Sequence, residues 1–257
     1  MIGRLVKIII IFVFSTLVFD VQNKEMVIKA NDNALLSKER DNNYYTKGAT
    51  SNSRVINNSM ANPAQTTEEL QKIISKANNG DIIYIASMTL TETITIDKSI
   101  TIVGQSKKVT IVGLTAKNSR HFIVTKTVDV TLRNFQLVGS KKANKKKVNG
   151  GVYFKYHDGY NADAKIRFDS MIFANFNNSK SDSIIDIDTS PASYVSRKDK
   201  QAYNETFVEL TINNSAFVAD NINYNNRYLI YLENGILYLN NSQINLPAFK
   251  IKSATLI

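Results

Sequence analysis

Residues 66–105 read TTEELQKIISKANNGDIIYIASMTLTETITIDKSITIVGQ, and the spacing of apolar residues changes at Gly80. Thr66 can cap a helix while Glu69, three residues later, reaches back to the N–H of the cap, which is the capping-box pattern. An apolar stripe with helical spacing follows, made of Leu70, Ile73, Ile74 and Ala77. Residues 78–80 (Asn-Asn-Gly) tolerate the left-handed backbone that ends many helices. We therefore predict a short helix with one face to bury.

After the helix the apolar period is two, which is typical of β-strands. β-Branched residues fill short runs at residues 82–85, 93–96, 100–103 and 109–112. Strands this short cannot build a wide sandwich, but they can stack as the rungs of a solenoid. An amphipathic helix across the first rung would cover its apolar side chains and unpaired backbone groups.

The block EELQKIISKANNGDIIYIASMTLTETITIDKSITIVGQ resembles the start of a right-handed parallel β-helix of the pectin-lyase-like superfamily. The resemblance implies an all-β solenoid with an N-terminal capping α-helix, as in secreted bacterial surface proteins and polysaccharide-active enzymes. A second fragment, GGVY at residues 150–153 with IFAN at 172–175, resembles repeat phrases of polymorphic outer-membrane adhesins.

The N-terminus has the pattern of an export signal. Arg4 and Lys7 precede an apolar core at residues 8–19, which suits a secretory signal and is short for a membrane span. We predict a signal peptide over residues 1–30, with Ala30 as a late candidate for cleavage, and a secreted, extracellular protein that acts at a cell surface. The alternative is an uncleaved segment that anchors the chain in the membrane.

Two further regions follow. Residues 31–65 are rich in Asn, Ser, Lys and Thr without lasting periodicity, so we predict a flexible linker. Residues 66–257 are the predicted β-helix domain. No capping helix follows the last strand-like runs. We therefore expect that this domain is incomplete at its C-terminus, meets a partner there, or is covered by an irregular segment.

Composition narrows the function. The 257 residues are 43% hydrophobic and include no cysteine, which excludes disulfides, thiolate catalysis and cysteine metal sites. The net charge of +10 favours anionic partners. Because no helix-turn-helix, zinc or RNA-binding signature accompanies this charge, we do not expect a nucleic-acid partner.

A phrase of the form apolar-x-Asn-x-x-apolar recurs after residue 120. Its third position is occupied by Asn134, Ser170, Asn214 and Asn241. Asparagine tolerates a left-handed backbone at the tight turn between two strands of a coil, and its equivalents can hydrogen-bond as a ladder. Ser170 departs from that ladder. Inserted loops are expected near residues 140–150, 156–164, 175–183, 189–206 and 220–227.

The best acidic cluster lies at residues 182–188. Strand alternation would put Asp186 and Asp188 on one outer face, and Asp182 has the same parity. Such carboxylates could bind Ca²⁺, and two close together could act as general acid and base. Lys165 or Arg167 is the base that the pectin-lyase-like resemblance implies, although no complete catalytic phrase of a polygalacturonase is present. The alternative is an ordinary solvated face. Beyond Ca²⁺ we expect no cofactor.

A basic cluster occupies one predicted loop, with Lys141, Lys142, Lys145, Lys146 and Lys147. Tyr153 and Tyr156 follow closely. Lysines attract sulfated or uronate sugars, wall polymers or lipid head groups, and tyrosine rings can stack on sugar faces. The alternative is that these lysines only keep an insertion soluble and discourage edge pairing.

Two hypotheses follow. The first is a secreted, adhesin-like module that binds anionic polysaccharide or a host or cell-wall surface through the lysine loop and the tyrosines. The second is a pectin-lyase-like polysaccharide lyase or glycoside hydrolase that uses Asp186, Asp188 and Arg167. The absence of complete catalytic phrases favours the first.

Overall fold

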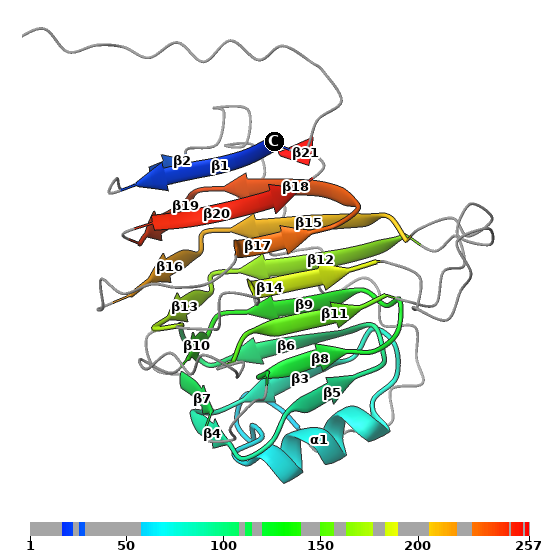
Figure 1. Cartoon of the computed structure of the whole chain (residues 1–257). Coiled ribbons are helices and arrows are strands. Elements are labelled where there is room, and N and C mark those ends of the chain that lie inside the picture. Colours follow the sequence, from blue (N-terminus) through cyan, green and yellow to red (C-terminus); the bar gives the residue numbers. More distant parts are fainter. Residues whose placement is uncertain are drawn as a thin grey trace, which may run out of the picture.

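The computed structural model is a stack of short strands with a helix at one end (Figure 1). It describes residues 17–22, 26–28, 58–107, 111–114, 120–139, 150–156, 163–176, 183–189, 206–219, 228–246, 248–253 and 255–256. The helix, α1 (Thr67–Lys76), closes the end of the stack that holds the first coil.

Three sheets form the walls of the stack. Sheet I contains β5 (Ile94–Ile96), β8 (Phe122–Val124), β11 (Val152–Lys155), β14 (Ser183–Asp188), β17 (Tyr228–Leu232), β20 (Ala248–Ser253) and β1 (Leu17–Gln22). Sheet II contains β3 (Ile82–Ile85), β6 (Ile100–Gly104), β9 (Val130–Arg133), β12 (Ala164–Asp169), β15 (Val208–Asn213), β18 (Gly235–Asn240) and β21 (Thr255–Leu256). Sheet III contains β4 (Met88–Leu90), β7 (Ile111–Leu114), β10 (Gln136–Val138), β13 (Ile172–Ala174), β16 (Ala216–Val218), β19 (Ser242–Asn245) and β2 (Met26–Ile28).

Each coil passes through sheets II, III and I in turn, and successive coils pair in parallel. This confirms the predicted all-β parallel β-helix with an N-terminal capping helix. Strands β3, β5, β6 and β7 overlap the predicted runs. The sequence did not indicate β4, because its only β-branched residue is Thr89, whereas the equally short β5 is β-branched throughout.

The start of α1 follows the predicted capping pattern with one difference. The Thr66 side chain accepts a hydrogen bond from the N–H of Glu69 at 3.1 Å, as expected for an N-cap. The Glu69 carboxylate, however, accepts from the N–H of Gln65 at 2.9 Å rather than from that of Thr66. Leu70, Ile74 and Ala77 are buried, so the predicted stripe faces the first coil.

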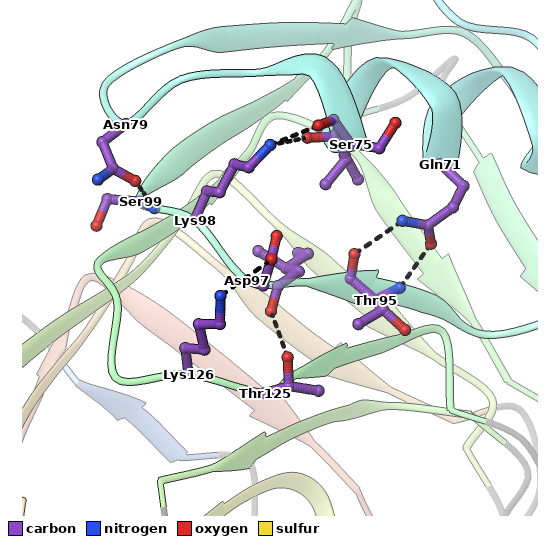
Figure 2. Close-up of polar contacts among 11 residues, drawn as sticks. Gln71, Ser75, Asn79, Thr95, Asp97, Lys98, Ser99, Thr125 and Lys126 are labelled. Carbon is purple, nitrogen blue, oxygen red and sulfur yellow. Dashed lines mark hydrogen bonds and ion pairs between the residues drawn. The ribbon is translucent and has the colours of Figure 1, made fainter. Parts of the chain in front are cut away.

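Side chains near the cap also occupy the open backbone edges of the first coil. The amide of Gln71 donates to the carbonyl of Thr95 and accepts from its N–H, at 3.1 and 2.8 Å (Figure 2). Asn58 makes the same pair of bonds to Tyr84 on β3, at 3.0 and 2.6 Å. A primary amide thus substitutes for one residue of a neighbouring strand, and these two edges are unavailable for pairing with another chain.

The interior is filled by alternate residues of each strand. β5, β8 and β12 alternate buried with more exposed residues, so each of these strands contributes one apolar row, while β14 and β17 contain consecutive buried residues. Aromatic rings stack between coils in the middle of the solenoid. The rings of Phe173 and Phe217 lie 4.6 Å apart and nearly parallel, and Phe168 contacts Phe173 edge-on at 5.4 Å.

The turns from sheet II to sheet III adopt the predicted left-handed backbone. Asn134, Ser170, Asn214 and Asn241 have φ values of +63°, +55°, +50° and +46°. Ser170 therefore departs in residue type but not in conformation. One side-chain bond between coils lies one position earlier than expected, since Asn240 donates to Asn213 at 2.9 Å, and Asn214 donates to Asp169 at 3.4 Å.

Each predicted insertion lies, to within one residue, between the end of one strand and the start of the next, so the predicted loops and the observed strand boundaries agree. The predicted domain boundaries remain predictions, and the structure adds two observations about them. Residues 58–65 of the predicted linker contact the first coil, where Ala64 is buried. Residues 17–28 of the predicted signal peptide contain β1 and β2, which pair antiparallel with the last coil. No helix among the described residues is long and apolar enough to span a membrane.

Candidate functional site

The candidate site is the outer face of sheet I. Tyr153 on β11 lies in register with Asp186 on β14, Asp186 with Tyr231 on β17, and Tyr231 with Lys252 on β20. Residues in register on parallel strands share one face of the sheet. These four side chains therefore form one row along the stack, which we call the sheet I row.

Asp186 is held by an arginine from two coils earlier. Arg120, just before β8, donates from Nη2 to Oδ2 of Asp186 at 3.1 Å and from Nη1 to the carbonyl of Ser183. The side chain of Arg120 is 7% exposed and that of Asp186 is 21% exposed. The guanidinium carbon also lies 5.7 Å from the ring centre of Tyr153. Arg120 thus balances the charge of Asp186 and fixes the tyrosine beside it.

Asp188 lies two residues along the same strand, and its side chain accepts a hydrogen bond from the Tyr153 hydroxyl at 3.1 Å. Burial raises the pKa of Tyr153 above its ordinary value, and the negative charge of Asp188 raises it further. The phenol therefore stays protonated and remains a donor. Lys155, which is exposed, lies in register with Asp188.

The other half of the row is aromatic and basic. Nζ of Lys252 lies 4.6 Å from the ring centre of Tyr231 and 3.3 Å from its hydroxyl. The ring of Tyr228 lies 5.7 Å from that of Tyr231, inclined by 45°. The site thus presents tyrosine rings on both sides of the Asp186 carboxylate.

The edge of the site is built on His121 and two glycines. Nδ1 of His121 accepts from the N–H of Gly151 at 2.9 Å, so Nε2 carries the proton and donates to the carbonyl of Val138 at 3.2 Å. Burial lowers the pKa of His121 to about 4, which keeps the ring neutral at pH 7. Gly150 and Gly151 have φ of +102° and +104°, and a Cβ on Gly151 would collide with the carbonyl of Ile184.

The structure brings some predicted residues together and separates others. Asp186 and Asp188 share the outer face of sheet I, with Ile185 and Ile187 buried beneath, as predicted. Arg167 and Lys165 are exposed on β12 of sheet II. They therefore lie on a different wall of the solenoid from the two aspartates.

The prediction for Tyr156 is corrected. Its side chain is fully buried, and its hydroxyl donates to the carbonyl of Val128 at 2.8 Å. The ring packs against Phe154, with centres 5.8 Å apart. It therefore offers no face to a ligand, because it continues the strand alternation that buries Val152 and Phe154 and exposes Lys155.

Other predicted residues lie outside the described part of the chain: Asp182, Lys141, Lys142, Lys145, Lys146 and Lys147. The lysines fall between β10 and β11, in the connection that enters sheet I at Gly150. Among described residues no group of three or more histidine, cysteine or acidic side chains could hold a metal ion. The candidate Ca²⁺ site, which includes Asp182, stays a prediction.

Four residues of the site were not predicted from the sequence: Arg120, Lys155, Tyr231 and Lys252. Strand alternation could have placed Lys252 on an outer face, because AFKIKS has period two, whereas YLIYL, with two consecutive buried residues before Tyr231, does not alternate. The register that aligns them with Asp186 could not be inferred, since insertions of unequal length separate these coils.

Comparisons of the chain with models of protein families, with curated proteins and with solved structures found no match. Its function must therefore be inferred from the chemistry of sheet I.

Proposed function

We propose that this protein is exported and binds an extended anionic polysaccharide, of a host or a cell wall, along the outer face of sheet I. One observation carries the proposal: Tyr153, Asp186, Tyr231 and Lys252 follow one register line across four successive coils. Both tyrosines are half-buried on the outer face, where their rings can stack on sugar faces, and a carboxylate between them can accept hydrogen bonds from sugar hydroxyls.

The geometry of the row suits a polymer better than a compact ligand. Neighbouring strands lie about 4.8 Å apart, which is close to the length of one sugar unit in an extended chain. A polysaccharide parallel to the solenoid axis would therefore meet an equivalent position on each coil. Tyr153 and Tyr231 are two coils apart and would contact alternate sugars.

Charge favours an acidic polymer. The chain carries a net charge of +10, and Lys155, Lys250 and Lys252 lie on the strands of sheet I. Arg120 compensates the charge of Asp186. The five lysines of residues 141–147 belong to the connection that enters the same sheet, so their charge adds to the attraction over about 10 Å at 0.1 M salt.

The finer assignments belong to the same proposal. The resemblance of residues 68–105 to pectin-lyase-like proteins and the export pattern of residues 1–30 support a secreted, adhesin-like protein of that superfamily. The stacked parallel sheets are compatible with this assignment.

Titration with a soluble uronate polymer, at low and at high salt, tests the proposal. We expect Tyr231→Ala to weaken binding about 3- to 10-fold, the usual contribution of an aromatic contact. Tyr238→Ala is the matched control, because Tyr238 is a half-buried tyrosine on sheet II and its loss should leave affinity unchanged. Equal loss in both variants, or no binding by the wild type to any of a panel of acidic polysaccharides, would contradict the proposal.

A lyase is the second candidate, and it is favoured by the position of Lys155 in register with Asp188. A lyase needs a base beside groups that neutralise the uronate, and Lys155 could fill this role where Arg167 on sheet II could not. Unsaturated product formed by the wild type, increased by Ca²⁺ and lost in Lys155→Ala, would support it. Binding without turnover would exclude it for the polymers tested.

A further inference from the structure

The two ends of the solenoid are closed in different ways. At the first coil, side chains such as Gln71 occupy the backbone groups of the edge strands (Figure 2). At the last coil two strands from the start of the chain do so, because β1 pairs antiparallel with β20 and β2 with β19 (Figure 1). Residues separated by more than 200 positions in the sequence are therefore neighbours in sheets I and III.

The register of β1 on β20 matches the two sequences by chemistry. Ile251 and Ser253 are buried in β20, and the residues opposite them in register are Phe19 and Leu17. Lys250 is exposed, and the residue opposite it is Asp20. Leu17 and Phe19 thus lie in register with buried residues and Asp20 with a lysine, while Val18 lies opposite the partly exposed Lys252.

β2 also places apolar residues opposite buried ones. Ile244 and Ser242 are buried in β19, and the residues opposite them are Met26 and Ile28. All three residues of β2 are apolar, and Val27 lies opposite the exposed Gln243, so β2 alone does not select a register. In β1 a shift by one residue toward the end of β20 would bring Asp20 opposite the buried Ile251, so the observed register is encoded in residues 17–22.

The connection is long enough for this arrangement. Residues 29–57 join β2, at the last coil, to Asn58 beside the first coil. An extended chain of that length reaches on the order of 100 Å, whereas seven strands at about 4.8 Å each span roughly 30 Å. The chain can therefore run the full height of the solenoid.

We propose that residues 17–28 are the C-terminal cap of the β-helix, which requires the alternative in which the N-terminal segment stays attached to the chain and is not cleaved at Ala30. The edge of the last coil then binds an antiparallel strand that has apolar residues at alternate positions and an acidic residue opposite Lys250. In the full chain this strand is the protein's own N-terminal segment. Loss of that segment would expose the edges of β19 and β20 as strand-binding surfaces.

Disulfide trapping in the full chain tests this, because the natural sequence has no cysteine. Two in-register pairs, Asp20→Cys with Lys250→Cys and Val18→Cys with Lys252→Cys, should cross-link within one chain under mild oxidation. The swapped pairs, 20 with 252 and 18 with 250, are matched controls. They lie on the same face but about 7–8 Å apart, beyond disulfide reach, and should lose the cross-link.

Mass analysis under non-reducing conditions separates the outcomes. An in-register cross-link within a monomer, absent from both swapped pairs, is the expected result. Cross-linking of all pairs alike, or of none, would overturn the proposal. A cross-linked dimer would also overturn it, because the acceptor would then hold a second copy. Amide hydrogen exchange of β5 and β6 verifies that each variant retains its fold.

Discussion

His121 shows how much one buried side chain contributes at the edge of the candidate site. Its two ring nitrogens bond the backbone of Val138 and of Gly151, the described residues on either side of the lysine-rich connection. Protonation would turn Nδ1 from an acceptor into a donor and oppose the N–H of Gly151. The ring therefore holds both strand ends only while it is neutral.

This predicts a loss of stability in acid. The pKa of His121 is about 4 in the folded chain and 6.5 when exposed, so the unfolded state binds more protons between these values. The free energy of unfolding should be unaffected by His121 above pH 6.5 and fall by up to about 3 kcal/mol as the pH drops toward 4.

Urea unfolding at pH 7.5 and pH 4.5 measures this difference. His121→Gln should lose the part of the decrease that belongs to the ring, whereas His157→Gln, which removes the other histidine of the chain, should retain it. The same decrease in the wild type and in His121→Gln would contradict the assignment.

Single residues also show where prediction from sequence succeeds. The left-handed turns at Asn134, Asn214 and Asn241 were predictable because asparagine tolerates this conformation locally. The burial of Tyr156 also follows from alternation, because Tyr156 has the parity of Val152 and Phe154 and the opposite parity to Tyr153. The expectation that Tyr153 and Tyr156 share one binding face was wrong for this reason.

Among the elements, α1 and the first coil are joined by apolar packing and by hydrogen bonds. The apolar stripe of α1 faces the core. Lys98 donates to the carbonyls of Ile74 and Ser75 at the end of the helix, at 3.2 and 2.6 Å (Figure 2). A lysine near a helix C-terminus also interacts favourably with the helix dipole. The helix was predictable from its cap and stripe, but its polar contacts with β5 were not, because they join residues of different elements.

Gln71 gives the sharpest test of the cap. Gln71→Ala removes two hydrogen bonds to the edge of β5, and water can replace part of them, so we expect a loss of about 1 kcal/mol. Lys72→Ala removes an exposed neighbour of the same helix and should change the free energy of unfolding little. Thermal unfolding of both variants measures the difference. A similar small effect in both would mean that α1 covers the core without sealing the edge.

In the whole molecule, the predicted basic residues Lys165 and Arg167 and the predicted aspartates Asp186 and Asp188 lie on different sheets of the solenoid. The sequence predicted a solenoid with aspartates on an outer face, and both features are present. It could not show that Arg167 belongs to sheet II and the aspartates to sheet I, because the intervening insertions hide which strand of a coil each segment forms. Register across coils is a property of the assembled stack.

Oxidative footprinting of tyrosines with a saturating uronate polymer would show which wall of the solenoid the polysaccharide contacts. All four tyrosines compared are half-buried: Tyr153 and Tyr231 lie on sheet I, and Tyr84 and Tyr238 lie on sheet II. The account predicts that the polymer protects the first pair and leaves the second pair as reactive as in the free protein. Protection of Tyr84 and Tyr238, or of neither pair while the polymer is bound, would contradict a polysaccharide site on sheet I.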